Sequence, residues 1–174
     1  MIYFTSDLHL YHDNAIIHNK RPYVNTEEMN DRLIKNFNAR VDNNDEVYIL
    51  GDITLKGASL ANEIISSLNG RKHFIKGNHD RFISRESFDK TLFVSIGDYA
   101  ELKYNDKFFV LSHYPFLEWN GFFRGAIHLH GHQHNKAGYN ILNKKNGILR
   151  YDVGVDANNM APVSVEEIIS FFEG

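Results

Sequence analysis

Five short apolar segments each end in a cluster of polar side chains, and this arrangement constrains the fold more than any other feature of the sequence. The clusters read DLH, GD, GNHD, SH and GHQH. Such side chains add nothing to a hydrophobic core, so each cluster is either a polar turn or part of a shared site. The five segments lie at residues 1–6, 46–51, 72–77, 108–113 and 126–131.

These segments are rich in β-branched and aromatic residues and nearly continuous in apolar character, as expected for strands that are covered on both faces. Apolar residues at helical spacing predict helices between and after them. Strands that alternate with helices indicate βαβ units around a largely parallel sheet. A sixth strand is predicted at 148–154, a hairpin within 101–113, and helices at 26–37, 58–69 and 164–172.

Three residue patterns mark where these helices begin and end. Asn25 and Glu28 form a predicted capping box for the first helix, and Ser164 and Glu167 form one for the last. Gly70 follows the second helix at the place where a left-handed residue commonly ends one.

The polar clusters are expected to meet, because the carboxyl ends of parallel strands lie along one edge of a sheet, where ligands bind. One crevice would then hold carboxylates, an amide and several imidazoles. Histidine is the commonest metal ligand, and five of the ten histidines fall within residues 113–134. This clustering favours one shared site over five unrelated polar turns.

Composition narrows the class of protein. The 174 residues, with 43% hydrophobic and 24% charged residues, are typical of one globular domain spanning 1–174. A net charge of −3 gives no overall attraction to nucleic acid or anionic membrane. The absence of cysteine excludes disulfides and thiolate metal sites. We see no secretory signal and no apolar run of roughly 20 residues, so we expect a cytoplasmic protein without membrane contact.

Taken in order, the clusters resemble the signature of the calcineurin-like metallophosphoesterases, which runs D-x-H, GD, GNH followed by D or E, H, and GH-x-H. Every element is present, over residues 7–134, and segments 12–14 and 21–23 are similar to those of small bacterial and phage members. The resemblance implies a layered α/β/β/α fold, with a mostly parallel central sheet flanked by helices. It also implies a metal-dependent phosphoric ester hydrolase.

The resemblance further implies two divalent metal ions, with manganese, iron, zinc or nickel all suited to nitrogen and oxygen ligands. Asp52 would bridge the ions, which would hold a phosphoryl group and activate a water molecule for attack. His79 would protonate the leaving oxygen, and Asp80 would orient its ring. The other predicted ligands are Asp7, His9 and His134 for one ion, and Asn78, His113 and His132 for the second.

Four more residues are candidates for substrate binding. His12 lies three residues after His9, Arg21 and Arg81 are possible phosphate clamps, and Tyr114 opens an aromatic loop after His113. For each of them a structural or solvated role is the alternative. His128 and His130 are expected to be buried and hydrogen-bonded, and His18 and His73 to be structural or exposed.

The predicted substrate is a small phosphomonoester or phosphodiester, with a nucleotide among the options. The alternatives are a nuclease-like phosphodiesterase acting on nucleic acid, which the lack of excess basic residues disfavours, and a non-catalytic scaffold of the same fold. Scaffolds of that kind lose ligands or the acid histidine, whereas all are present here. Exposed aromatic residues at 116–123 would suit a homodimer.

Overall fold

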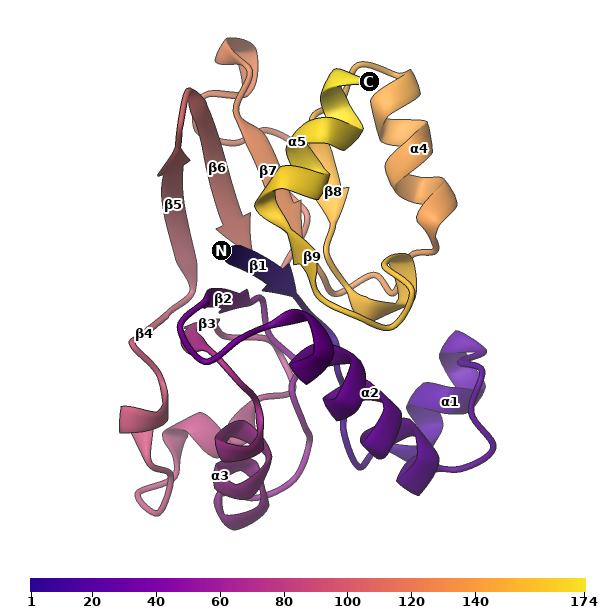
Figure 1. Cartoon of the computed structure of the whole chain (residues 1–174), viewed down its shortest axis with the longest axis vertical. Helices are drawn as coiled ribbons and strands as arrows, with labels where there is room; N and C mark the ends of the chain where they lie inside the picture. The colour runs from indigo at the N-terminus through magenta and orange to yellow at the C-terminus, as the bar shows by residue number, and fades with distance from the viewer.

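Five strands form the first sheet of the computed structural model, which describes residues 1–174 (Figure 1). Their order is β4-β3-β2-β1-β9. Strands β1 to β4 run parallel to their neighbours, and β9 pairs antiparallel to β1. The strands are β1 (Ile2–Thr5), β2 (Glu46–Ile49), β3 (Arg71–Ile75), β4 (Ser95–Gly97) and β9 (Val163–Ser164).

Four strands form the second sheet, in the order β5-β6-β7-β8. Strands β5 and β6 are the predicted hairpin, which turns at Asn105 with a φ of 52°. Strands β6, β7 and β8 are parallel. The strands are β5 (Tyr99–Tyr104), β6 (Lys107–Ser112), β7 (Ile127–His130) and β8 (Arg150–Asp152).

A hydrophobic cluster lies between the two sheets. Phe4 and Leu50 from the first sheet pack in one buried cluster with Phe109, Leu111 and Leu129 from the second. The other face of the first sheet packs against α2 and α3 in a separate cluster. Strands β1 to β3 are therefore covered on both faces, which explains their continuous apolar sequences and confirms the predicted layered α/β architecture.

Helices cover the outer surfaces of the sheets, with α2 and α3 beside the first sheet and α4 and α5 beside β8 and β9 (Figure 1). None of them is long and apolar enough to cross a lipid bilayer. The α-helices are α1 (Asp13–Asn19), α2 (Thr26–Arg40), α3 (Ala58–Ser67), α4 (Ala137–Lys145) and α5 (Val165–Glu173). Short 3-10 helices occupy Arg81–Ser84, Lys90–Leu92, Phe122–Arg124 and Val155–Ala157.

The predicted ends of the helices are confirmed in part. Ser164 and Glu167 form the reciprocal capping box of α5. The Asn25 side chain caps α2 by accepting from the Glu28 amide, but the Glu28 carboxylate accepts from the amide of Val24, so the predicted box is only half formed. Helix α3 ends in an extended residue at 68, two residues before the predicted glycine.

Helix α4 was not predicted, because it attaches to the protein through polar side chains. Its buried residues are Asn140 and Asn143, whereas Ile141 and Leu142 are 59% and 56% exposed. The Asn140 amide donates to the Asp152 carbonyl at 3.1 Å and accepts from the Asp152 amide at 2.8 Å. A helix held in this way has no apolar stripe for a sequence pattern to detect.

We expect Asn140→Ala to lower the free energy of unfolding by about 1–3 kcal/mol, because the buried amide of Asp152 loses the side-chain oxygen that it bonds. The Asp152 carbonyl loses one of its two side-chain donors and keeps the other, Asn158. Ile141→Ala on the same helix is the control and should change it by no more than about 0.5 kcal/mol. Urea denaturation followed by circular dichroism measures both. Equal effects of the two substitutions would contradict a polar attachment of α4.

Candidate metal centre

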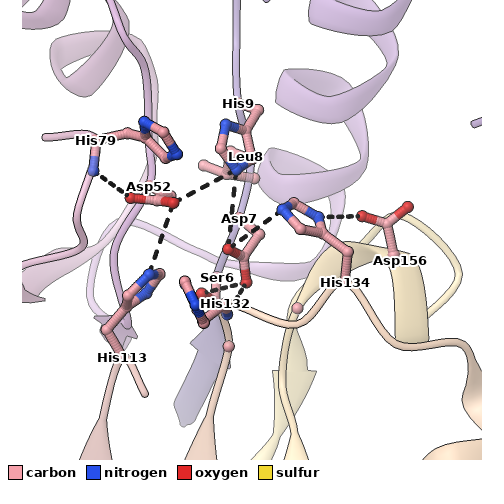
Figure 2. Close-up of polar contacts among 12 residues, drawn as sticks. Ser6, Asp7, Leu8, His9, Asp52, His79, His113, His132, His134 and Asp156 are labelled. Carbon is pink, nitrogen blue, oxygen red and sulfur yellow. Dashed lines mark hydrogen bonds and ion pairs between the residues drawn. The ribbon is translucent and has the colours of Figure 1, made fainter. Parts of the chain in front are cut away.

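Seven side chains predicted as ligands converge at the carboxyl ends of strands from both sheets. Figure 2 shows these side chains apart from that of Asn78. The sheets meet there through backbone contacts: Ser6 forms a parallel bridge with Gly154, and the Val155 amide donates to the Ser6 carbonyl at 3.1 Å. The seven residues are Asp7 and His9 after β1, Asp52 after β2, Asn78 after β3, His113 after β6, and His132 and His134 after β7.

The first group consists of Asp7, His9 and His134. The Oδ1 atom of Asp7 lies 3.9 Å from Nε2 of His9 and 3.9 Å from Nε2 of His134. These separations are too long for hydrogen bonds. They are near the ~3.4 Å that separates two ligands on one tetrahedral ion with bonds of about 2.1 Å. The three atoms therefore surround a space suited to one cation.

The second group consists of Asn78, His113 and His132, which meet at one oxygen. Oδ1 of Asn78 lies 2.9 Å from Nε2 of His113 and 3.0 Å from Nδ1 of His132. Asp52 lies between the two groups, because its Oδ2 is 3.5 Å from Nε2 of His9 and 3.6 Å from Nε2 of His113. Its other oxygen accepts from the His79 amide, so Oδ2 is the oxygen that faces both groups.

Burial makes the first group unfavourable without a cation. It raises the pKa of Asp7 to about 7 and lowers that of His9 to about 2, so the imidazole is neutral, the form that binds metals. Oδ1 of Asp7 and both ring nitrogens of His9 are buried without a hydrogen-bond partner. A divalent cation would satisfy the oxygen and one nitrogen and would favour the ionised carboxylate. The residues present thus fit the metal that the sequence predicts.

The backbone is in an unusual conformation at most of the predicted ligands. Ten residues other than glycine have a positive φ, and five of them are among the seven ligands. This left-handed conformation costs an ordinary residue roughly 1–3 kcal/mol, and such strain collects at functional sites. The five are Asp7 at 57°, His9 at 48°, Asp52 at 57°, His132 at 70° and His134 at 50°.

His79 and Asp80 follow the predicted ligand Asn78, but their side chains do not contact each other. The ring of His79 forms no hydrogen bond and stands 5.6 Å from the ring of His9 between centroids. The buried carboxylate of Asp80 instead accepts from three backbone amides, those of residues 52, 53 and 77, at 2.7 to 2.9 Å. The prediction that Asp80 orients the ring of His79 is therefore wrong. Asp80 fixes the loops that carry Asp52 and Asn78.

The prediction that Arg21 is a phosphate clamp is also wrong, because the side chain of Arg21 is fully buried. Its guanidinium pairs with Asp156 at 2.8 Å and donates to the carbonyls of Asp7 and Leu8 at 2.6 and 2.8 Å. The arginine thus holds the strained turn after β1 in place.

Asp156 is a residue of the site that the sequence analysis missed. Its Oδ2 accepts from Nδ1 of His134 at 3.1 Å, which directs Nε2 of that ring toward Asp7 (Figure 2). Burial alone would raise the pKa of Asp156, but hydrogen bonds from His134 and Arg21 outweigh it and hold the pKa well below its usual range. A carboxylate behind a ligating histidine fixes the ring orientation. The sequence carried one signal for this residue: an aspartate follows the predicted strand at 148–154, as aspartates follow other strands of the site.

The remaining predicted residues differ in their distance from the centre. Tyr114 is half-exposed and packs its ring 4.6 Å from that of His132. Arg81 is exposed and forms no ion pair. His12 lies 5.6 Å from His9 between ring centroids, and His18, expected to be structural or exposed, is exposed and lines the same cavity beside the centre.

His128 and His130 are buried and hydrogen-bonded, as predicted. Nδ1 of His128 lies 3.0 Å from the Val110 carbonyl, and its Nε2 accepts from the Phe116 amide. Nε2 of His130 lies 3.2 Å from the hydroxyl of Tyr139. These contacts occupy the ring nitrogens and keep both histidines away from the group of predicted ligands.

Comparison with known proteins gives consistent matches over almost the whole chain. A family model described as calcineurin-like phosphoesterase matches residues 1–149. An uncharacterized protein of Methanocaldococcus jannaschii is 37% identical, covering 99% of this chain and 91% of its own. The gene 66 protein of Mycobacterium phage L5 is 31% identical, covering 89% and 86%. A crystal structure of an Aquifex aeolicus protein of unknown function superposes with a TM-score of 0.74 at 29% identity, covering 98% of both chains.

We expect Asp156→Asn to weaken metal binding roughly 10- to 100-fold, because His134 loses the carboxylate that orients it. It should also lower the free energy of unfolding by about 3–5 kcal/mol, since Arg21 stays buried without a counter-charge. Titration calorimetry with Mn²⁺ and urea denaturation measure the two effects. The control is Asp98→Asn, which breaks an exposed pair with Lys76 and should change neither. Unaltered metal affinity in Asp156→Asn would contradict this role.

We expect Gly131→Ala to abolish metal binding, because a Cβ at this position would lie 1.9 Å from Oγ of Ser6 and 2.3 Å from Oδ2 of Asp7. Gly138→Ala is the matched control, since nothing lies within 4 Å of its Cβ position. That change within α4 should raise the free energy of unfolding by about 0.5–1 kcal/mol. Metal content by elemental analysis and urea denaturation test the pair, and a Gly131→Ala protein that retained its metal would refute the predicted clash.

Proposed function

Because the chain belongs to the calcineurin-like phosphoesterase family, we propose that it hydrolyses phosphoric esters with two divalent ions held in the centre described above. The observation that supports this best is the position of Asp52. Its Oδ2 lies within 3.6 Å of Nε2 of both His9 and His113, as expected for a carboxylate that bridges two ions. Asp7, His9 and His134 would hold one ion, and Asn78, His113 and His132 the second.

The donor set is made of nitrogen and oxygen atoms, which suits manganese, iron, zinc or nickel. Two divalent ions would hold a phosphoryl group between them, polarise it and supply a nucleophile from water. The carboxylates of Asp7 and Asp52 supply two negative charges against four positive ones. The surplus positive charge favours an anionic phosphate ester as substrate.

His79 is the residue in place to protonate the leaving oxygen. Its amide donates to Oδ1 of Asp52 at 2.9 Å, which fixes its backbone next to the bridging carboxylate. Its ring is free of hydrogen bonds and lies beside His9 (Figure 2). A ring nitrogen of His79 can therefore carry a proton to the alcohol oxygen as the bond to phosphorus breaks.

We expect His79→Ala to lower kcat roughly 10²- to 10⁴-fold on alkyl phosphates, whose alkoxide is a poor leaving group, and much less on p-nitrophenyl phosphate. Metal content should be unchanged, because His79 is not among the predicted ligands. Phosphate release in the presence of Mn²⁺, with elemental analysis of each protein, tests this. His73→Ala is the control, since that ring bonds Glu46 and Ser95 elsewhere on β3.

Two results would contradict the proposal at different points. A His79→Ala enzyme that hydrolysed every ester at the wild-type rate would remove His79 from the reaction. A wild-type protein that was stripped by chelator and then hydrolysed no ester after Mn²⁺ was restored would contradict the activity itself.

A further inference from the structure

A polar cavity of about 180 Å³ lies between α1 and the candidate metal centre. We infer that this cavity receives the leaving group of the substrate and selects a small alcohol bearing additional hydroxyl groups. The inference rests on the proposed function and adds a substrate class to it. The cavity is lined by His9, His12, Asn14, Ala15, His18, Asn19, His79 and His134.

The residues of the cavity place it on the leaving-group side of the centre. His9 and His134 belong to the first group of predicted ligands, and His79 is the proposed acid. An alcohol oxygen that receives a proton from His79 must lie within hydrogen-bond reach of that ring. The carbon skeleton attached to this oxygen then extends into the cavity that the same ring lines.

The chemistry of the lining indicates hydroxyl groups rather than a second anion. No Lys, Arg, Asp or Glu side chain lines the cavity. The amides of Asn14 and Asn19 and the imidazole rings can offer donors and acceptors, as a hydroxyl does. A carboxylate or second phosphate only accepts, and its usual partners are Arg and Lys.

The lining also disfavours an aromatic leaving group. Ala15 is its only hydrophobic residue, so a nucleobase would find no aromatic side chain other than the imidazoles on which to stack. Tyr114 contacts the rings of His113 and His132, in the other group of ligands, and does not line the cavity. A volume of about 180 Å³ accommodates a glycerol-sized group.

The wall that carries His12 and His18 is fixed to the rest of the site. Nζ of Lys136 donates to the Asn19 carbonyl at 2.7 Å and to Asp156 at 3.1 Å. Arg21 pairs with the same aspartate just beyond the end of α1. The helix is thereby joined to the carboxylate that orients His134. A cavity held in this way is formed before the substrate arrives, which lowers the entropic cost of binding.

The test compares two phosphate monoesters of similar size, glycerol 1-phosphate and propyl phosphate, which differ in two hydroxyl groups. The readout is the ratio of their kcat/KM values in the Mn²⁺-loaded protein. The wild type should favour the glycerol ester. His18→Ala and Asn14→Ala should each reduce that ratio roughly three- to tenfold, the loss expected for one neutral hydrogen bond. Ile17→Ala is the control, because this residue of α1 is 70% exposed outside the cavity, and it should leave the ratio unchanged.

A second measurement does not depend on hydrolysis. In the diamagnetic zinc-loaded protein, glycerol should shift the ring C–H magnetic resonance signals of His12 and His18, and 1-propanol at the same concentration should not. Wild-type ratios in both variants, or equal shifts with the two alcohols, would overturn the inference. A wild type that released phosphate from no ester would instead contradict the proposed function, and the glycerol titration would still decide the nature of the cavity.

Discussion

Two buried carboxylates impose the constraint on which this structure depends. Asp7 and Asp52 are buried at the junction of the sheets, and no Lys or Arg side chain is paired with either. Such charges are costly unless cations or hydrogen bonds compensate them. The surrounding imidazoles leave lone pairs directed at the same space, so a metal ion is the compensation that the geometry admits.

The loops that carry these side chains adopt strained backbone conformations, and these conformations bring the side chains together. Left-handed conformations at Asp7, His9 and Asp52 turn each side chain sharply at a strand end. The strain is held by specific partners: Arg21 binds two carbonyls after β1, and Asp80 binds three amides around the second and third strand ends. Arg21 and Asp80 are thus buried charged residues that bind backbone groups, and their role is to fix the conformation of the loops.

Sequence patterns predicted the parts of this protein that depend on apolar periodicity and on order along the chain. The buried strands and helices α2, α3 and α5 follow from their apolar residues. Helix α4 could not be found, because asparagine side chains attach it. Parallel topology predicted that strand ends meet within one sheet, but the sequence did not predict that the ends come from two sheets joined at Ser6 and Gly154. The role of Asp156 was not, because its contact with His134 depends on a turn whose path no local pattern specifies.

The antiparallel pairing of β9 with β1 has a consequence for how the protein is made. During translation the first strand and the predicted ligands that follow it leave the ribosome long before Asp156 and β9. Until then Arg21 has no counter-charge and β1 forms an open edge of its sheet. We therefore expect nascent chains to acquire a fully ordered candidate metal site only after β9 has emerged and paired with β1.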